Sequence, residues 1–216
     1  TIRLQLVREG ALEPLILAVS SESVEVQREV AAALCNLALA EENKVTMARS
    51  GVVGALIALM QSRDVVRETH ACACLANLAE MVEGRTQRRL VDEGSLRYLL
   101  NLAASEDPEV RREVARAMAL FAAKRDSHAA LQRAGSVPCL VNFARGDDVV
   151  AKRFGCLGIG NLAIVGANHQ ELFDSGAIAS LLPLAVSDDL ETRRCTAFAM
   201  NNVASNEKNH RVLERM

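Results

Sequence analysis

One helix-like segment returns five times along this chain, and the repetition restricts the chain to a small group of folds. The first copy is VEVQREVAAALCNLALA, and the later copies read VVRETHACACLANLA, EVRREVARAMALFAA, VVAKRFGCLGIGNLA and ETRRCTAFAMNNVAS. A glycine precedes each copy, and the numbering of the five glycines, Gly10, Gly51, Gly94, Gly135 and Gly176, advances in steps of 41, 43, 41 and 41. A period near 41 is typical of solenoids that stack two or three helices per repeat.

The residues around each glycine predict a short helix, a turn and a second helix. Apolar residues within 1–8 indicate a first helix that ends at Gly10, a residue type that readily adopts the positive φ of a helix end. We number positions from each glycine. Position +5 is always leucine and +6 is always aliphatic, which predicts the buried stripe of the second helix. Pro183 lies too deep in that helix to be tolerated at its first turn, so we expect a kink or a late start there.

A third helix is predicted to start at +13, where every residue is of a type that caps helix N-termini: Ser23, Asp64, Asp107, Asp148 and Asp189. Positions +24 and +27 are large and apolar, and +28 is always alanine, so these positions form one buried face. Arginine stands at +18 in four repeats. We expect these arginines to pair with carboxylates at +15, as in Arg28 with Glu25, although the same ladder could grip an acidic partner.

Composition excludes several classes of protein. The chain has 25 basic and 27 acidic residues, so no overall positive charge attracts nucleic acid. The six cysteines include no CxxC pair and mostly lie in apolar helical patterns, which indicates free thiols and a cytoplasmic location. The longest weakly charged run, 30–40, is too short to cross a bilayer, so we expect no direct membrane insertion.

Signatures of catalysis and of cofactor binding are lacking. The sequence contains no nucleophile elbow, phosphate loop or HExxH motif. The run GCLGIGN from Gly155 resembles a dinucleotide-binding fingerprint, but it lies in a helical pattern with no strand before it and so lacks the required context. His128, His169 and His210 recur once per period, which places them too far apart along a stack of helices to share one metal ion. We therefore expect no enzyme activity, no metal and no cofactor.

The period divides residues 1–216 into one array. Its repeats span about 1–41, 42–84, 85–125, 126–166 and 167–207, with a partial sixth at 208–216. The one longer step reflects an insertion between Asn77 and Gly94. Because the pattern stops just before the next expected glycine, we interpret the chain as a fragment of a longer protein.

Three helices per period, with glycine before the second and a third reading VQREVAAALCNLA, resemble the armadillo repeat over the whole chain. The resemblance implies an all-α, right-handed solenoid of about five repeats. The segments EENKVTMARSGVVGALIALM and NEKNHRVLERM are most similar to the subgroup that contains the yeast vacuole-anchoring and plant U-box armadillo proteins.

The armadillo resemblance also implies a binding mode. Such proteins hold extended segments of partners along a concave groove lined by the third helices, where one asparagine per repeat clamps the partner's backbone. That position is +26, which holds Asn36, Asn77, Leu120, Asn161 and Asn202. A nuclear-import receptor of the importin-α type would carry tryptophan four positions earlier, and this chain has none.

The sequence thus predicts a protein-interaction scaffold that binds a peptide or helix of another protein. The predicted peptide-binding residues are Asn36, Asn77, Asn161, Asn202, Arg116, Phe154, Leu157 and Phe198. Two alternatives remain open for the side chains: the asparagines could stabilise the stack instead, and the aromatic rings could turn inward over Gly155, Gly158 and Gly160. For the whole chain, the alternative is an element that self-associates through its ends.

Overall fold

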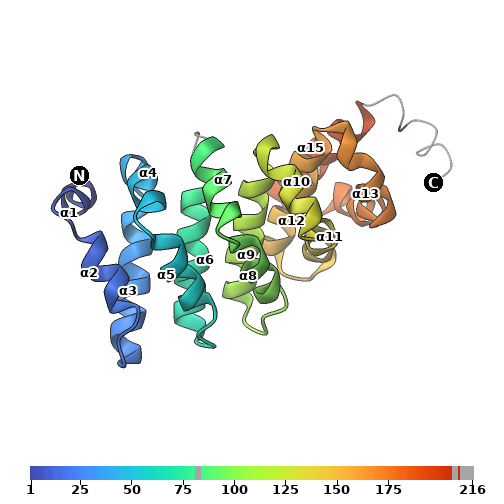
Figure 1. The fold of residues 1–216 in the computed structure, drawn as a ribbon. Helices are drawn as coiled ribbons and strands as arrows, with labels where there is room; N and C mark the ends of the chain where they lie inside the picture. Colours follow the sequence, from blue (N-terminus) through green and yellow to red (C-terminus); the bar gives the residue numbers. More distant parts are fainter. Residues whose placement is uncertain (81–83, 206–208, 210–216) are drawn as a thin grey trace. The chain divides into compact units, whose positions relative to one another are not determined.

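A computed structural model describes residues 1–80, 84–205 and 209, and the described residues form helices with no strand. The elements are α1 (Ile2–Arg8), α2 (Leu12–Ala18), α3 (Val24–Leu37), α4 (Glu41–Arg49), α5 (Val52–Met60), α6 (Val65–Ala79), α7 (Gly84–Asp92), α8 (Ser95–Leu102), α9 (Pro108–Ala122), α10 (Arg125–Arg133), α11 (Ser136–Arg145), α12 (Val149–Ala163), η1 (Gly166–Asn168), α13 (His169–Asp174), α14 (Ala177–Leu181), η2 (Leu182–Val186) and α15 (Leu190–Ala204). Figure 1 shows their order along the chain.

The helices form two compact units, Thr1–Ala117 and Met118–Met216, and the boundary falls inside α9. In unit 1, the third helices α3 and α6 pack together, α5 packs against α6 and α8, and α4 packs against both α1 and α7. In unit 2, α12 packs against α11 and α15, and α14 packs against α11. Within each unit, equivalent helices of successive repeats therefore lie side by side, as expected for a solenoid.

The predicted helix ends are confirmed. All five repeat glycines have positive φ, between 72° and 89°, and each lies between a first and a second helix. The residue at +13 precedes the third helix in every repeat, and its side chain accepts a hydrogen bond from a backbone N–H of the first turn. The shortest of these bonds runs from Thr192 N to Asp189 Oδ2, at 2.7 Å, and the longest from Val26 N to Ser23 Oγ, at 3.3 Å. These caps fix where each third helix begins.

The predicted core is confirmed in the first four repeats, where +24, +27 and +28 are at most 4% exposed. The last repeat differs, because Met200 is half-buried and Ala204 is exposed. In the second helices, +5 is buried in every repeat but the first, where Leu15 is half-buried. Position +6 is fully buried only at Val141, half-buried in the first three repeats and 55% exposed at Leu182. Leu182 lies where the short helix α14 stops and the chain continues as the 3-10 helix η2, with Pro183 near its start. The expected break at Pro183 is therefore present.

Two sequence predictions fall outside the described residues, wholly or in part. The insertion in the second repeat involves 81–83, and the partial sixth repeat is described only at Asn209. Within the described chain, no single helix is both long and apolar enough to cross a membrane, and α12 with the segment after it passes only as a pair bent by 116°.

Candidate peptide-binding face

Three of the four asparagines at +26 join their third helix to the third helix of the preceding repeat. Asn161 Nδ2 donates to the Ala119 carbonyl at 3.0 Å, and Asn202 Nδ2 donates to the Gly160 carbonyl at 3.0 Å. Asn77 Nδ2 reaches the equivalent carbonyl, that of Cys35, at 3.5 Å. In each case the acceptor is at +25 of the preceding repeat. The stacking role left open by the sequence is thus real for these three nitrogens.

The amide oxygens differ among the repeats. Those of Asn161 and Asn202 accept no hydrogen bond within the described part of the chain. Asn77 Oδ1, in contrast, accepts from Arg116 Nη1 at 3.0 Å. Because Nδ2 holds the side chain across the stack, the two oxygens in unit 2 are fixed in orientation and have capacity for a further donor. Asn202 is half-buried, whereas Asn161 is only 9% exposed, so Asn202 is the more accessible of the two.

Arg116 has its guanidinium engaged on three sides. Nη1 donates to Asn77, Nη2 to the Ala73 carbonyl at 3.1 Å, and Nε to Glu113 Oε2 at 2.8 Å. Arg116 therefore belongs to a polar network inside unit 1, and Asn77 is only 5% exposed. The sequence predicted Arg116 to meet an acidic partner, and that role would require these bonds to break.

The three large apolar residues predicted for the face are Phe154, Leu157 and Phe198, and all are half-buried. Phe198 lies over a glycine of the neighbouring helix, since a Cβ added to Gly160 would be 2.6 Å from Phe198 Cδ1. One edge of the Phe198 ring therefore packs against Gly160, as in the alternative in which the aromatic rings fill the space beside the glycines of α12. Phe154 and Leu157 are three positions apart on α12, so they lie on one side of that helix.

Two of the arginines at +18, Arg28 and Arg153, do not pair as predicted. Arg28 binds Asp64 through Nη2 at 2.7 Å and Nε at 3.2 Å, and Arg153 binds Asp189 in the same two-pronged way. Both aspartates are caps of the following third helix. Arg194, in contrast, pairs with the carboxylate three positions before it, that of Glu191. The hydrogen bond from Arg28 lowers the pKa of Asp64 to about 2.

The recurring histidines form a second link between repeats, which the sequence analysis missed. His128 Nε2 lies 2.8 Å from the Ala122 carbonyl, so this nitrogen carries the proton. Nδ1 is then the acceptor for Asn168 Nδ2 at 2.9 Å, and the same Nδ2 donates to the Leu162 carbonyl. His169 repeats the arrangement with Ala163 and Asn209. The sequence contains a sign of this link, because an asparagine directly precedes His169 and His210, one period apart.

Acid is expected to destabilise unit 2 through His128. Burial is the main cause that lowers the pKa of His128 below its usual 6.5, and Arg125 lowers it further. The unfolded chain therefore binds the proton more readily, so the stability due to the neutral ring is complete above about pH 6.5 and is lost below it. Between pH 7.5 and 5.5, the free energy of unfolding in urea should fall by up to about 1.4 kcal/mol per pH unit from this group.

The control for this pH effect is His128→Gln. Gln87 is the counterpart of His128 in the third repeat, and its Nε2 donates to the Ala79 carbonyl at 3.0 Å. Glutamine can therefore replace the donor without titrating. The variant should show a shallower dependence of unfolding free energy on pH, and equal slopes in parent and variant would contradict the assignment.

The six cysteines are free thiols, as predicted. Burial raises the pKa of Cys139 to about 12 and that of Cys156 to about 11, so neither is a thiolate near neutral pH. No group of three His, Cys, Asp or Glu side chains close enough to hold a metal ion occurs among the described residues.

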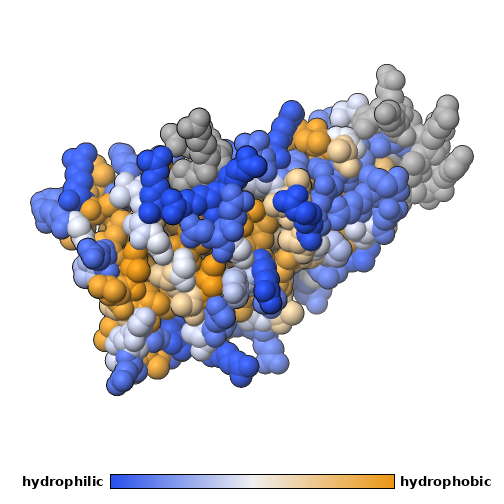
Figure 2. Space-filling model, viewed as in Figure 1, coloured by the Kyte–Doolittle hydropathy of each residue, from blue (hydrophilic) through white to orange (hydrophobic). Residues whose placement is uncertain are grey.

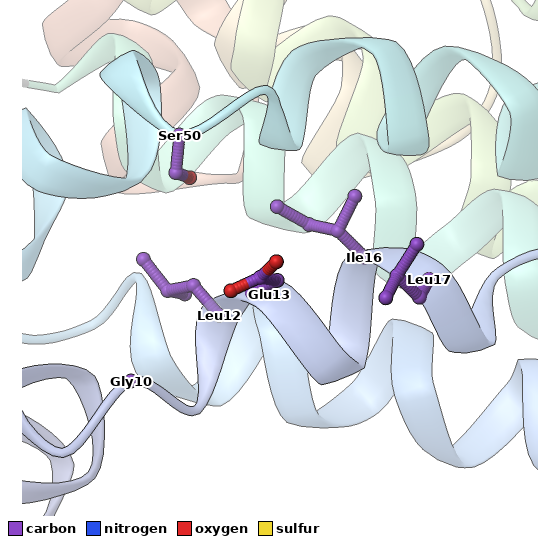
Figure 3. Close-up of a pocket in the computed structure, with 6 residues that line it drawn as sticks. All are labelled: Gly10, Leu12, Glu13, Ile16, Leu17 and Ser50. Atoms are coloured by element: carbon purple, nitrogen blue, oxygen red, sulfur yellow. The ribbon is translucent and has the colours of Figure 1, made fainter.

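A shallow hollow of about 430 Å³ lies beside α2 (Figure 3). Leu12, Ile16 and Leu17 line it from α2, and Ser50 faces them from the end of α4. Glu13 is the one charged residue in this lining, and the Ser50 hydroxyl already donates to the Met47 carbonyl at 2.8 Å. Figure 2 shows apolar surface over α2, where Leu17 is 69% exposed. The lining of this hollow therefore holds no group of polar side chains that could bind a charged ligand or carry out catalysis.

Comparisons with known proteins agree with the geometry. Residues 2–39 match the armadillo/β-catenin-like repeat family. A designed armadillo repeat protein in complex with the peptide (KR)4 is 24% identical, with a TM-score of 0.88, over 93% of this chain and 85% of that one. An engineered protein is 26% identical, with a TM-score of 0.90, over 94% and 85% of the two chains.

A computationally designed armadillo repeat protein for modular peptide recognition is 24% identical, with a TM-score of 0.87, over 93% and 85%. No curated protein sequence matches the chain significantly. The fold is therefore that of the armadillo-repeat solenoids, and the sequence match to that family's repeat lies in the first repeat of the chain.

Proposed function

We propose that this protein is an interaction scaffold that binds an extended segment of a partner protein along the third helices of unit 2. One observation carries the proposal. The side chains of Asn161 and Asn202 are held in place by their nitrogens, while their oxygens accept no hydrogen bond in the described structure. A peptide backbone N–H is the donor that such an oxygen suits.

The surroundings of the two asparagines support a peptide ligand. Phe154 and Leu157 on α12 and Phe198 on α15 are each half-buried, so each keeps part of its apolar surface available to a partner side chain. Designed armadillo proteins with the same fold bind the peptide (KR)4 or were made for modular peptide recognition. The proposal requires binding alone and no chemical step.

Unit 1 is a less suitable site. The oxygen of Asn77 already accepts from Arg116, while the exposed side chain of Asn36 makes no hydrogen bond within the described residues and is not held in one orientation. The resemblance to the vacuole-anchoring and plant U-box subgroup is not needed for this proposal. We also propose a cytoplasmic location, because free thiols such as the six of this chain are typical of reducing compartments.

Selection of random peptides displayed on phage against the immobilised chain tests the proposed function. We expect selected peptides to protect amides of α12 and α15 from hydrogen exchange. The double change Asn161→Ala with Asn202→Ala should weaken their binding at least tenfold, which corresponds to the loss of about 1.4 kcal/mol. The matched control is Asn142→Ala, because Asn142 is an exposed asparagine of α11 in the same unit.

Circular dichroism must show that the double variant stays helical, since each asparagine also contributes a stacking hydrogen bond worth about 1 kcal/mol. Phe154→Ala is a second test that leaves those bonds in place. Peptides that bind both variants as tightly as the parent would exclude this face as the binding site.

A further inference from the structure

The hollow beside α2 lies between two described repeats of unit 1. Leu12, Ile16 and Leu17 line it from the first repeat, and Ser50 lines it from the second (Figure 3). A preceding repeat would cover a different side of α2, the side of Leu15, because the leucines at +5 in the later repeats are 0% exposed. Leu15 does not line this hollow. The hollow therefore belongs to the outer surface between two neighbouring second helices.

Stacking leaves position +7 of the second helix exposed along the whole array. The residues at this position are Leu17, Ala58, Asn101, Asn142 and Pro183, and each is exposed. Neighbouring repeats therefore do not cover it, even in the middle of the array. Leu17 is the one large aliphatic residue among the five, and it is 69% exposed beside half-buried Ile16. A single leucine on a surface is ordinary, but one that adjoins an apolar hollow indicates an interaction site.

The outer side of α5 lets a partner come close to this hollow. Its residues at +3 and +7 are Gly54 and Ala58, and both are exposed. A Cβ added to Gly54 would meet no atom within 4 Å, so no other side chain lies over this part of α5. The distance between two packed helices depends on the side chains at their contact, and small residues shorten it. A helix laid along α2 can therefore rest against α5 as well.

The lining favours a helical partner over an extended one. Its one hydroxyl, Ser50 Oγ, already donates to the Met47 carbonyl, and the backbone N–H groups of Gly10 and Ser50 donate to the carbonyls of Val7 and Met47. An extended segment would place its own N–H and C=O groups against aliphatic side chains with few partners, which is unfavourable. A helix pairs its backbone groups internally and needs only an apolar side to bind.

Glu13 adds a charge requirement, since it is the only charged residue in the lining. It is exposed, and its carboxylate makes no ion pair and no hydrogen bond within the described part of the chain. Leu12 precedes it and Ile16 follows three positions later, so the carboxylate stands beside the apolar surface. A partner with lysine or arginine next to its apolar side matches this arrangement. Such an exposed pair adds little affinity but selects the partner and its orientation.

From these observations we propose that the hollow binds an amphipathic helix of another protein. The aliphatic side of that helix covers Leu12, Ile16 and Leu17, and its basic residue faces Glu13. The proposal is independent of the peptide-binding face of unit 2, because it concerns second helices of unit 1 and a helical ligand. The two sites share no residue, so substitutions can remove each of them separately.

The probe for this site is a fluorescent peptide of about 18 residues, long enough to form a helix. Its leucines are spaced three and four residues apart along one side, one lysine lies beside them, and alanine and glutamine fill the rest. Fluorescence anisotropy should show saturable binding to the parent chain. Leu17→Glu should weaken this binding at least tenfold, because it places a charge in the apolar contact. The matched control is Leu39→Glu, since Leu39 is a 53% exposed leucine of the same unit that lies outside the hollow.

Charge provides a second readout, which a loss of structure would not produce. Glu13→Lys should weaken binding of the lysine peptide about fivefold and strengthen binding of a peptide with glutamate in its place. A peptide with proline at its centre should bind at least tenfold more weakly than the helical one.

The proposal is overturned if the parent chain does not bind the helical peptide, or if Leu17→Glu binds it as tightly as the parent. Equal binding of the helical and the proline peptides would exclude a helix as the ligand. Sedimentation equilibrium of the parent alone adds a further check, because a dimer that Leu17→Glu dissociates would assign the hollow to a second copy of this chain. The double change Asn161→Ala with Asn202→Ala should leave binding of the helical peptide unchanged, which separates this site from the one in unit 2.

Discussion

Replacing Gly155 by alanine should destabilise unit 2 by about 3 kcal/mol, although alanine is the better helix former. A Cβ at this position of α12 would lie 2.6 Å from the Ala144 nitrogen and 2.8 Å from the Leu140 oxygen. Both atoms belong to the backbone of α11 and cannot rotate away, so the two helices would have to separate. Urea unfolding followed by circular dichroism measures the loss.

Alanine substitutions at two other helical glycines serve as controls for Gly155→Ala. Gly54→Ala in α5 meets no atom within 4 Å and should stabilise the chain by about 0.5–1 kcal/mol, through reduced freedom of the unfolded backbone. Gly158→Ala should fall between the two, because its Cβ would meet the ends of the flexible Leu140 side chain. If Gly155→Ala unfolds at the same urea concentration as the parent, the close contact of α11 with α12 is wrong.

Truncating Leu99 to alanine should cost about 2–5 kcal/mol, the range for a fully buried leucine that leaves a cavity. Leu99 is 0% exposed in α8, a helix that packs against α5 and α7. Each repeat of a solenoid contacts only its neighbours, so the loss falls on this repeat and on its interface with the repeat of α5. The midpoint of unfolding in urea should shift accordingly.

Leu17→Ala is the matched control, since Leu17 is a leucine of the equivalent helix α2 but is 69% exposed. This change should alter the free energy of unfolding by about 0.5 kcal/mol or less. Equal losses for the two variants would mean that the +5 leucines do not form the core.

The sequence predicted the helices well because their ends depend on local chemistry. A positive φ at Gly51 and a side-chain cap at Asp64 are properties of single residues and of the few amides beside them. The apolar stripe at +24 and +27 could be read in the same way. The stripe failed in the last repeat, where burial depends on what packs next to α15 and not on its own pattern.

Side-chain partners across repeats were harder to predict, because they depend on how far each helix rotates about its axis. Arg28 could reach Glu25 on its own helix or Asp64 on the next one, and both choices satisfy the charge. The two-pronged geometry with Asp64 decides between them in the structure. Both this pair and that of Arg153 with Asp189 join residues 36 positions apart. A search of the sequence for arginine and aspartate at one constant separation would have found them.

The roles of the candidate site residues were likewise only partly predictable from the sequence. Recurrence of asparagine at +26 indicated a common role but could not separate clamping a ligand from stacking the helices. The structure assigns the nitrogens of Asn161 and Asn202 to stacking and leaves their oxygens available, so each residue can serve in both ways. Nothing in the spacing indicated that Arg116 would occupy Asn77, since that contact joins residues 39 positions apart.

The carboxylate of Asp64 starts one helix and holds the previous one, and this double use couples the openings of neighbouring repeats. When the first turn of α6 frays, Arg28 on α3 loses its partner, so amides in the first two repeats should exchange with deuterium together. Asp107 caps α9 through the amides of Glu109 and Val110, and Thr69 stands at +18 of the repeat before it, where its buried hydroxyl has no hydrogen-bond partner in the described structure. Coupling through the cap should therefore end at this junction, where Arg116 of α9 holds α6 through Asn77 and the Ala73 carbonyl instead. Fraying of the first turn of α9 should leave the amides of α6 protected, in contrast to the joint exchange expected of α3 and α6.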